Sequence, residues 1–193
     1  MTSWYIRWNV SKPEDTISVT MLTTEDLTAA QRSSVIEVCV AAHDNDDFRN
    51  LFTRITSGGR HFLAYRGPEL VSHAVVTTRW VVPESQRVLK TAYVDAVAAL
   101  PMYQGRGYAS ALMGRLAAEI GDYEIACLQT DRPAFYERLG WEGWRGALAG
   151  RGEHGLIPTP RQRGVMVLRL PRTPPLDLAV QLTIECQPGR IWE

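Results

Sequence analysis

The chain has 193 residues, 45% of them hydrophobic, and a formal net charge of zero from 21 basic and 21 acidic residues. This length and apolar content predict a folded domain with a buried core and exclude a disordered chain. The balanced charge argues against a nucleic-acid partner, which would require a basic excess. The three cysteines lie far apart without CxxC spacing, and no metal site is expected. Because no secretory leader or membrane-length apolar run is recognisable, we expect a soluble cytoplasmic protein without a membrane partner.

Hydropathy patterning predicts an N-terminal tail at residues 1–15 and a single mixed α/β domain at 16–193. Residues 16–22 alternate as a strand. A helix is expected to begin at Thr24, because apolar residues at i, i+3, i+4 and i+7 from Val35 then form one face. The other expected elements are strands at 61–66, 70–82, 90–99, 124–129, 164–170 and 178–186, helices at 46–56, 105–120 and 132–139, and one long loop at 146–160.

A glycine-rich turn lies between the strand at 90–99 and the helix at 105–120. Such a turn presents free backbone N–H groups, which bind phosphate together with the positive end of the helix dipole. Glycine allows the backbone to approach the anion closely. The turn lacks both the Rossmann fingerprint and the Gly-Lys-Ser/Thr of a P-loop. The residues expected to hold the ligand here are Gln104, Gly105, Arg106, Gly107, Tyr108, Ala109 and Ser110.

An acidic residue, Asp95, interrupts the otherwise apolar strand at 90–99. An acid inside an apolar strand is costly unless it is solvated, paired or functional. A carboxylate near an amine can take the proton of that amine, directly or through one water. Asp95 is therefore a candidate catalytic residue. The alternative is an acid on the solvent face of an edge strand.

Two motifs resemble those of the GNAT acetyltransferase superfamily. Gln-x-x-Gly-x-Ala, beginning at Gln104, resembles its acyl-CoA pyrophosphate loop, and residues 134–141 (AFYERLGW) resemble its Phe/Leu-Tyr-x-x-x-Gly-Phe/Trp segment. The spacing of the motifs and the order of the elements also match. The resemblance implies a GNAT fold: a mixed central sheet with a splayed acetyl-CoA-binding strand pair and flanking helices. It also implies acetyl-CoA as cofactor.

The same resemblance assigns roles to individual residues. In the family, the strand before the loop splays near a bulge and binds the pantetheine arm, which implicates Val97 and Ala99. The Val97 N–H is then expected to face the thioester oxygen. Tyr136 corresponds to the tyrosine that protonates the departing thiolate. The alternative for Tyr136 is a buried aromatic residue whose hydroxyl bonds a backbone carbonyl. Direct transfer is expected, so Cys127 should be dispensable.

A more particular resemblance is to the aminoglycoside 2′-N-acetyltransferases, whose Tyr-Val-Glu-Gly-Val-Ala is similar to residues 93–98 (YVDAVA) and whose terminal Ala-Gly-Asp-Val-Trp is similar to residues 188–192 (PGRIW). An Asp-Phe near the amine site is similar to residues 47–48. This resemblance implies an aminoglycoside substrate and a small-molecule partner. The substrate-binding residues that it implies are Asp46, Asp47, Asp95, Gln129 and Trp192. Trp192 could equally anchor the last strand.

The chain departs from that family by losing acids and gaining arginines. Arg190 stands at an acidic position of the terminal segment, and residues 161–163 (RQR) replace an acidic run. Arginine pairs well with carboxylates. We therefore expect Arg163 and Arg190 to bind a carboxylate-bearing aminoglycoside, with kasugamycin favoured and resistance to it as the role. The alternative is that these arginines are simply solvated.

Other functions remain open at this point. They are a classical 2′-N-acetyltransferase of the gentamicin or tobramycin type, an N-acetyltransferase of protein termini or lysines, and a non-catalytic acyl-CoA-binding module. A peptide substrate would need an open groove, whereas the loop at 146–160 and Trp192 indicate a closed pocket. Thiol release in the presence of an acceptor would exclude the silent module. A homodimer is also left open by the resemblance.

Overall fold

The computed structural model describes residues 17–55, 57–187 and 189–192, so the predicted tail at 1–15 lies outside the described residues. Along the chain the elements are β1 (Ile17–Thr23), α1 (Ala29–His43), the 3-10 helix η2 (Asp46–Asn50), α2 (Leu51–Arg54), β2 (Arg60–Arg66), β3 (Glu69–Pro83), β4 (Leu89–Ala99), the 3-10 helix η3 (Pro101–Tyr103), α3 (Tyr108–Glu119), β5 (Ile125–Gln129), α4 (Pro133–Glu137), β6 (Glu142–Gly143), β7 (Leu148–Gly152), β8 (Gly155–Pro158), β9 (Val165–Arg169) and β10 (Leu182–Glu185).

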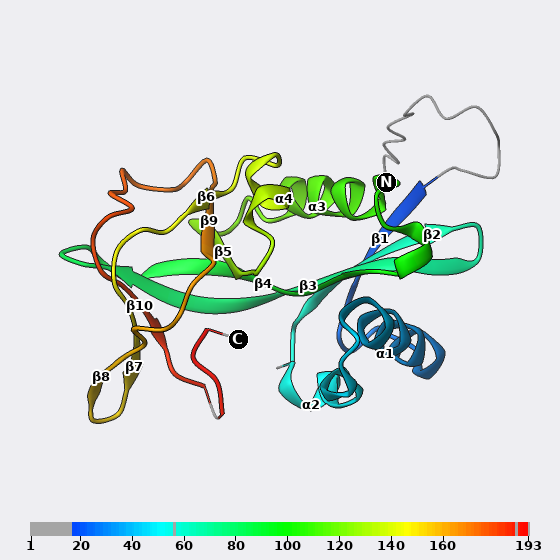
Figure 1. Ribbon diagram of the computed structural model, residues 1–193, viewed down its shortest axis with the longest axis horizontal. Coiled ribbons are helices and arrows are strands. Elements are labelled where there is room, and N and C mark those ends of the chain that lie inside the picture. Colours follow the sequence, from blue (N-terminus) through cyan, green and yellow to red (C-terminus); the bar gives the residue numbers. More distant parts are fainter. Residues whose placement is uncertain (1–16, 56, 188, 193) are drawn as a thin grey trace.

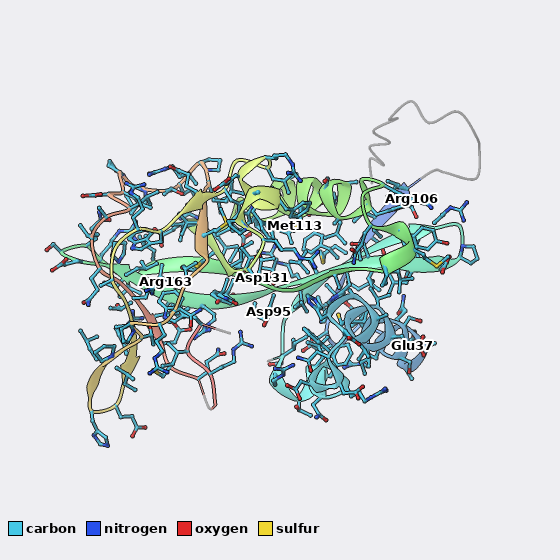
Figure 2. The ribbon with its side chains drawn as sticks, viewed as in Figure 1. Glu37, Asp95, Arg106, Met113, Asp131 and Arg163 are labelled. Carbon is cyan, nitrogen blue, oxygen red and sulfur yellow. The ribbon has the colours of Figure 1, made fainter. Side chains whose placement is uncertain are left out.

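One mixed sheet runs through the molecule, with α3 and α4 on one side and α1 and α2 on the other (Figure 1). The strand order is β6-β9-β5-β4-β3-β10-β7-β8, and β2 joins β1 to β3. Each helical layer buries an apolar face. Met113 is 2% exposed and points from α3 toward the sheet, whereas Glu37 lies on the exposed side of α1 (Figure 2). The predicted mixed α/β fold is confirmed.

The strand pair β4–β5 opens partway along its length. β4 pairs in parallel with β5 only over Thr91–Tyr93, opposite Ile125–Cys127, and the described residues show no further pairing between the two strands. Beyond Tyr93, β4 continues to Ala99 while still paired with β3. The predicted splay is therefore present, and backbone groups of the second half of β4 face the gap.

A β-bulge lies in β4 immediately after the splay begins. Val75 of β3 pairs with Asp95 and His73 pairs with Ala98, so β4 holds an extra residue here. Ala96 has a φ of 49°, in the left-handed region. That conformation costs an alanine about 1–2 kcal/mol. Two contacts oppose the cost: the Asp95 carboxylate accepts from the Ala96 N–H at 2.7 Å, and His73 Nδ1 lies 3.1 Å from the Ala96 carbonyl oxygen.

The predicted start of the first helix was wrong. The helix begins at Ala29, and Thr28 caps it in a capping box with Gln31. Thr24 is buried instead, where its N–H donates to the Gly59 carbonyl at 2.8 Å and its hydroxyl lies 3.1 Å from His61 Nε2. Both threonines suit an N-cap by sequence, and a contact with a distant strand decides between them.

The predicted long loop at 146–160 was also wrong, because it contains the hairpin β7–β8. β7 pairs in parallel with β10, so it is held by a strand more than 30 residues later. Leu156 and Ile157 of β8 are exposed, which explains why no buried pattern was evident. The predicted helix at 46–56 divides into η2 and α2.

Candidate functional site

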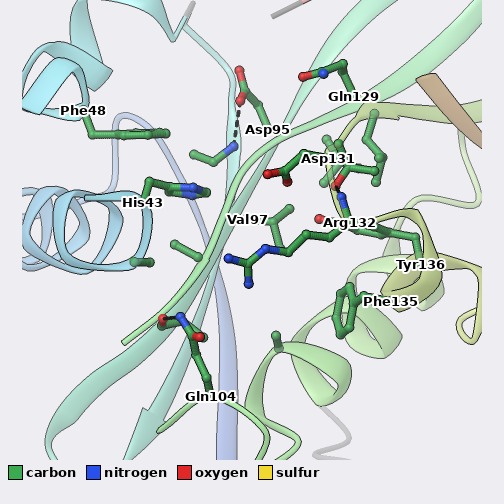
Figure 3. A pocket seen from close by; sticks show the side chains of 18 of the residues that line it. His43, Phe48, Asp95, Val97, Gln104, Gln129, Asp131, Arg132, Phe135 and Tyr136 are labelled. Atoms are coloured by element: carbon green, nitrogen blue, oxygen red, sulfur yellow. Dashed lines mark hydrogen bonds between the residues drawn. The ribbon is translucent and has the colours of Figure 1, made fainter. Parts of the chain in front are cut away.

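A cavity of about 910 Å³ opens where β4 and β5 splay apart (Figure 3). Its walls come from β4, the end of α1, the η2–α2 segment, the glycine-rich turn, α4 and the C-terminal residues. The predicted site residues that line it are Asp95, Val97, Ala99, Gln104, Gly105, Gly107, Tyr108, Ala109, Ser110, Gln129, Tyr136, Arg190 and Trp192. Residues as far apart in the sequence as Ala42 and Trp192 therefore line one cavity.

The glycine-rich turn forms one end of the cavity. Gly105 and Gly107 have φ values of 73° and 86°, which glycine adopts without strain. Gly107 is the N-cap of α3 and has no side chain that could cap the first N–H groups of the helix. The Gln104 amide donates to the Ala99 carbonyl at 3.1 Å and ties the turn to the end of β4. This arrangement fits a pyrophosphate.

Arg106 differs from the rest of the turn, since it is absent from the cavity wall. Its guanidinium carbon lies 5.7 Å from the centroid of the Tyr103 ring. The predicted role of Arg106 in binding the ligand stays a prediction.

Asp95 is paired with Arg190. An Arg190 guanidinium nitrogen lies 3.0 Å from Asp95 Oδ2, with side-chain exposures of 13% and 31%. Arg190 Nε is buried and has no hydrogen-bond partner among the described residues, and the guanidinium carbon lies 5.9 Å from the Tyr93 ring centroid. The structure thus joins two residues for which the sequence predicted separate tasks. The Arg190 charge is compensated mainly by one carboxylate.

Tyr136 projects from α4 into the opposite side of the cavity (Figure 3). It is 7% exposed and packs edge-on against Phe135 and Trp141, with ring centroids 4.9 and 6.0 Å away. Burial raises the pKa of Tyr136 to about 12, and the nearby charge of Asp131 adds to this increase. The phenol is therefore protonated at neutral pH, although the increase also makes it a weaker proton donor than an exposed tyrosine.

Trp192 is 1% exposed and belongs to the core beneath β10 and β9. Its indole N–H donates to the Thr159 hydroxyl at 3.2 Å, and its backbone carbonyl accepts from the Tyr93 hydroxyl. It anchors the C-terminal residues and also contributes to the cavity wall. This anchoring positions the neighbouring Arg190.

Three of the predicted substrate-binding residues do not line the cavity. Asp46 and Asp47 lie exposed on η2, where Asp46 pairs with Arg49 at 2.8 Å. Arg163 is exposed and donates to the carbonyl oxygens of Pro160 and Gln162, each at 2.7 Å. The structure therefore does not bring Arg163 together with Arg190 at one carboxylate-binding position.

Sequence reasoning missed part of the cavity wall. The polar and aromatic residues there that were not among the predicted site residues are His43, Asn45, Phe48, Arg54, Tyr93, Tyr103, Thr130, Asp131, Arg132, Phe135 and Arg138. His43 stacks on Phe48, with ring centroids 4.6 Å apart and an interplanar angle of 15°. Desolvation lowers the pKa of His43, partly opposed by a hydrogen bond with the Val97 backbone. The position of His43 beside the Asp-rich turn at 44–47 is compatible by sequence with either the substrate pocket or a solvated loop, and the sequence assigned His43 no role.

Two further histidines lie buried behind the bulge. His73 Nε2 is 3.0 Å from His61 Nδ1, and His61 Nε2 is 3.1 Å from the Thr24 hydroxyl. Because the Ala96 carbonyl can only accept, His73 Nδ1 must carry the proton that faces it. With neutral rings, His61 then donates to His73 and Thr24 donates to His61. Burial lowers the pKa of His73 to about 3 and that of His61 to about 4.

Within the described ranges, no helix is long and apolar enough to cross a membrane. A search of the same ranges finds no group of three or more His, Cys, Asp or Glu side chains that could hold a metal ion. The predicted cellular location stays a prediction.

Comparison with known proteins gives consistent results. Residues 22–143 match the family model described as acetyltransferase (GNAT) domain. The chain is 28% identical over 176 residues to the aminoglycoside 2′-N-acetyltransferase of Mycolicibacterium fortuitum, covering 88% of this chain and 89% of that protein.

Solved structures are similar in fold. The GNAT family N-acetyltransferase YhbS from Escherichia coli, solved in complex with CoA, matches with a TM-score of 0.59 and 14% identity over 88% of this chain and 89% of that one. Eis1 from Mycobacterium abscessus matches with a TM-score of 0.54 and 20% identity over 68% of this chain. The chain spans only 32% of the length of Eis1 and 34% of the matched Kribbella flavida acetyltransferase.

Proposed function

The chain belongs to the GNAT acetyltransferase family, since the matched residues make up more than half of its length; from this premise we propose that it transfers an acetyl group from acetyl-CoA directly to an amine of an aminoglycoside. Membership confirms the predicted family and fold, the predicted class of acetyl-CoA-dependent N-acetyltransferase, and acetyl-CoA as cofactor. The particular acceptor and the residue roles are our proposal.

One observation carries the proposal: a single cavity connects the glycine-rich turn to Asp95. The turn can hold the pyrophosphate of the acetyl donor, and Asp95 supplies a negative charge where a cationic amine would enter. An acetyltransferase needs both sites within reach of each other. The 28% identity to an aminoglycoside 2′-N-acetyltransferase supports an aminoglycoside acceptor.

Each of these residues has its own role in the reaction. Acetyl-CoA supplies the acetyl group as a thioester. Val97, beside the bulge, donates its N–H to the thioester oxygen. Asp95 attracts the cationic acceptor and orients its amine, and the protonated Tyr136 gives its hydroxyl proton to the departing thiolate. The wall residues exclude water from the reacting groups.

We propose kasugamycin as the favoured acceptor, because a guanidinium lies beside the acid in the cavity. Arg190 lines the wall, whereas Arg163 lies outside it. Of the two arginines that the sequence predicted, only Arg190 is therefore a candidate partner for an acceptor carboxylate, and it would have to divide its donors between Asp95 and that group. Arg132, also on the wall, adds positive charge that the sequence had not predicted.

Thiol release measured with acetyl-CoA and each acceptor tests the proposal. Release with kasugamycin but not gentamicin supports the carboxylate-binding reading, and release with gentamicin supports the classical type. Replacement Arg190→Met should then raise the KM for kasugamycin at least tenfold, while the matched control Arg163→Met leaves it unchanged. If neither antibiotic exceeds the acceptor-free control, the aminoglycoside assignment is wrong.

A further inference from the structure

Both carboxylate oxygens of Asp95 already have partners in this structure. One carboxylate oxygen accepts from the Ala96 N–H at 2.7 Å and the other lies 3.0 Å from Arg190. The first contact supports the left-handed residue of the bulge, and the second balances a guanidinium that is 13% exposed. The reaction therefore calls for another group to take the amine proton.

His43 is placed for that task. It is the last residue of α1, and Asp44 ends the helix with a φ of 49°. The ring leaves the helix at the cavity and points toward Val97 of β4 (Figure 3). Stacking on Phe48 fixes the plane of the ring, and the Val97 backbone lies close enough to raise the pKa of the imidazole, against the effect of desolvation. His43 thus lies beside the β4 residue whose N–H is proposed to face the thioester.

The charges around His43 come from three elements. Arg132, at the start of α4, opposes protonation of the imidazole, while Asp131 and Asp95 favour it. Arg54 of α2 lies on the same wall, with its guanidinium carbon 5.8 Å from the Phe48 ring centroid. Desolvation is the largest effect, so the pKa of His43 is lowered from 6.5. A neutral imidazole at neutral pH can accept a proton.

We propose that His43 is the catalytic base that takes the proton from the acceptor ammonium; this rests on the function proposed above. The ammonium N–H bond breaks and its proton moves to the imidazole. The freed nitrogen lone pair forms the C–N bond to the acetyl carbon, while the C–S bond breaks and its electrons leave on sulfur. The thiolate takes the Tyr136 proton. The nitrogen carries a positive charge after it forms the C–N bond, and it loses a second proton to solvent. Solvent reprotonates Tyr136 and His43 releases its proton, so the net release is one proton per turnover.

The test compares His43→Asn with His154→Asn. Asparagine can retain the hydrogen bond to a backbone group but cannot accept a proton at neutral pH. His154 is exposed, lies between β7 and β8, and does not line the cavity, so it is a matched control. Thermal unfolding and CoA binding should be unchanged in both variants. At pH 7 kcat/KM should fall about 10²- to 10⁴-fold in His43→Asn only.

Two further readouts separate a base from a structural residue. In the protein without ligands, the imidazole resonance of His43, assigned by its loss in His43→Asn, should titrate below 6.5. The activity deficit of His43→Asn should shrink as pH rises, because the acceptor amine then loses its proton to solvent. Retention of at least one third of wild-type kcat/KM at pH 7 would overturn the role of His43. Absence of turnover in the wild type with every amine tested would instead overturn the proposed function.

Discussion

The buried pair His61–His73 predicts a steep loss of stability at mildly acidic pH. Both rings are 0% exposed, and burial lowers their pKa values from 6.5 to about 4 for His61 and about 3 for His73. Since the folded-state pKa values lie below the unfolded value, the unfolded chain binds more protons once the pH falls toward 6.5. The two histidines therefore contribute their full stabilisation above pH 6.5, and this contribution is lost as the pH falls toward their folded-state pKa values.

The magnitude follows from linkage. Each histidine contributes roughly 2 kcal/mol between pH 8 and pH 5, when its pKa is 6.5 unfolded and near or below 4 folded. Together they amount to roughly 4 kcal/mol, a large part of the 5–15 kcal/mol typical of a domain. As the pH falls, this loss of unfolding free energy would occur before most of the loss caused by protonation of carboxylates, because carboxylates protonate mainly below pH 5.

Urea unfolding followed by tryptophan fluorescence between pH 8 and pH 5 measures this loss. The double substitution His61→Gln with His73→Asn keeps polar atoms near the Thr24 hydroxyl and the Ala96 carbonyl but removes the titration. It should abolish most of the pH dependence, whereas His154→Asn should retain it. A wild-type unfolding free energy that is flat over this range, or an undiminished loss in the double variant, would refute the reasoning.

Three further predictions concern the bulge and the cavity. Ala96→Gly should change the unfolding free energy by less than about 1 kcal/mol, because relief of strain offsets the flexibility of glycine, whereas Ala96→Val should lower it by about 2 kcal/mol or more in urea unfolding. Gly107→Val should weaken CoA binding at least tenfold by calorimetry, since its φ of 86° is unfavourable for valine; unchanged affinity would argue against the turn as the pyrophosphate site. Asp95→Asn should destabilise the fold more than the pair Asp95→Asn with Arg190→Met, because the single change leaves a guanidinium nearly buried without a counter-ion; a double-mutant cycle measures the difference.

Local signals in the sequence determined much of the fold. The turn at Gly107 and the helix after it could be predicted because their geometry depends on neighbouring residues. The apolar run around Asp95 likewise predicted a buried strand, β4. Motif resemblance then supplied the topology and placed Tyr136 at the site. In each case the decisive contacts join residues that are close in the sequence, or they belong to a motif that recurs in a protein family.

Elsewhere the sequence permitted more than one outcome. Thr24 and Thr28 are both suitable helix caps by sequence, and the contacts of Thr24 with Gly59 and His61, more than 30 residues away, give it another role. Hydropathy could not reveal β7–β8, because β8 is exposed and β7 depends on pairing with β10. Pairing between distant segments is a property of the assembled sheet.

The chemistry of the site was decided by tertiary structure. The sequence identified Asp95 as an unusual acid and Arg190 as an unusual gain of positive charge, but it could not show that they meet. β10 runs antiparallel to β3, and Trp192 anchors the chain segment that follows β10. Together these contacts bring Arg190 to the bulge in β4. The end of α1 similarly brings His43 beside Val97. The choice of proton acceptor thus depends on which charges are paired in three dimensions.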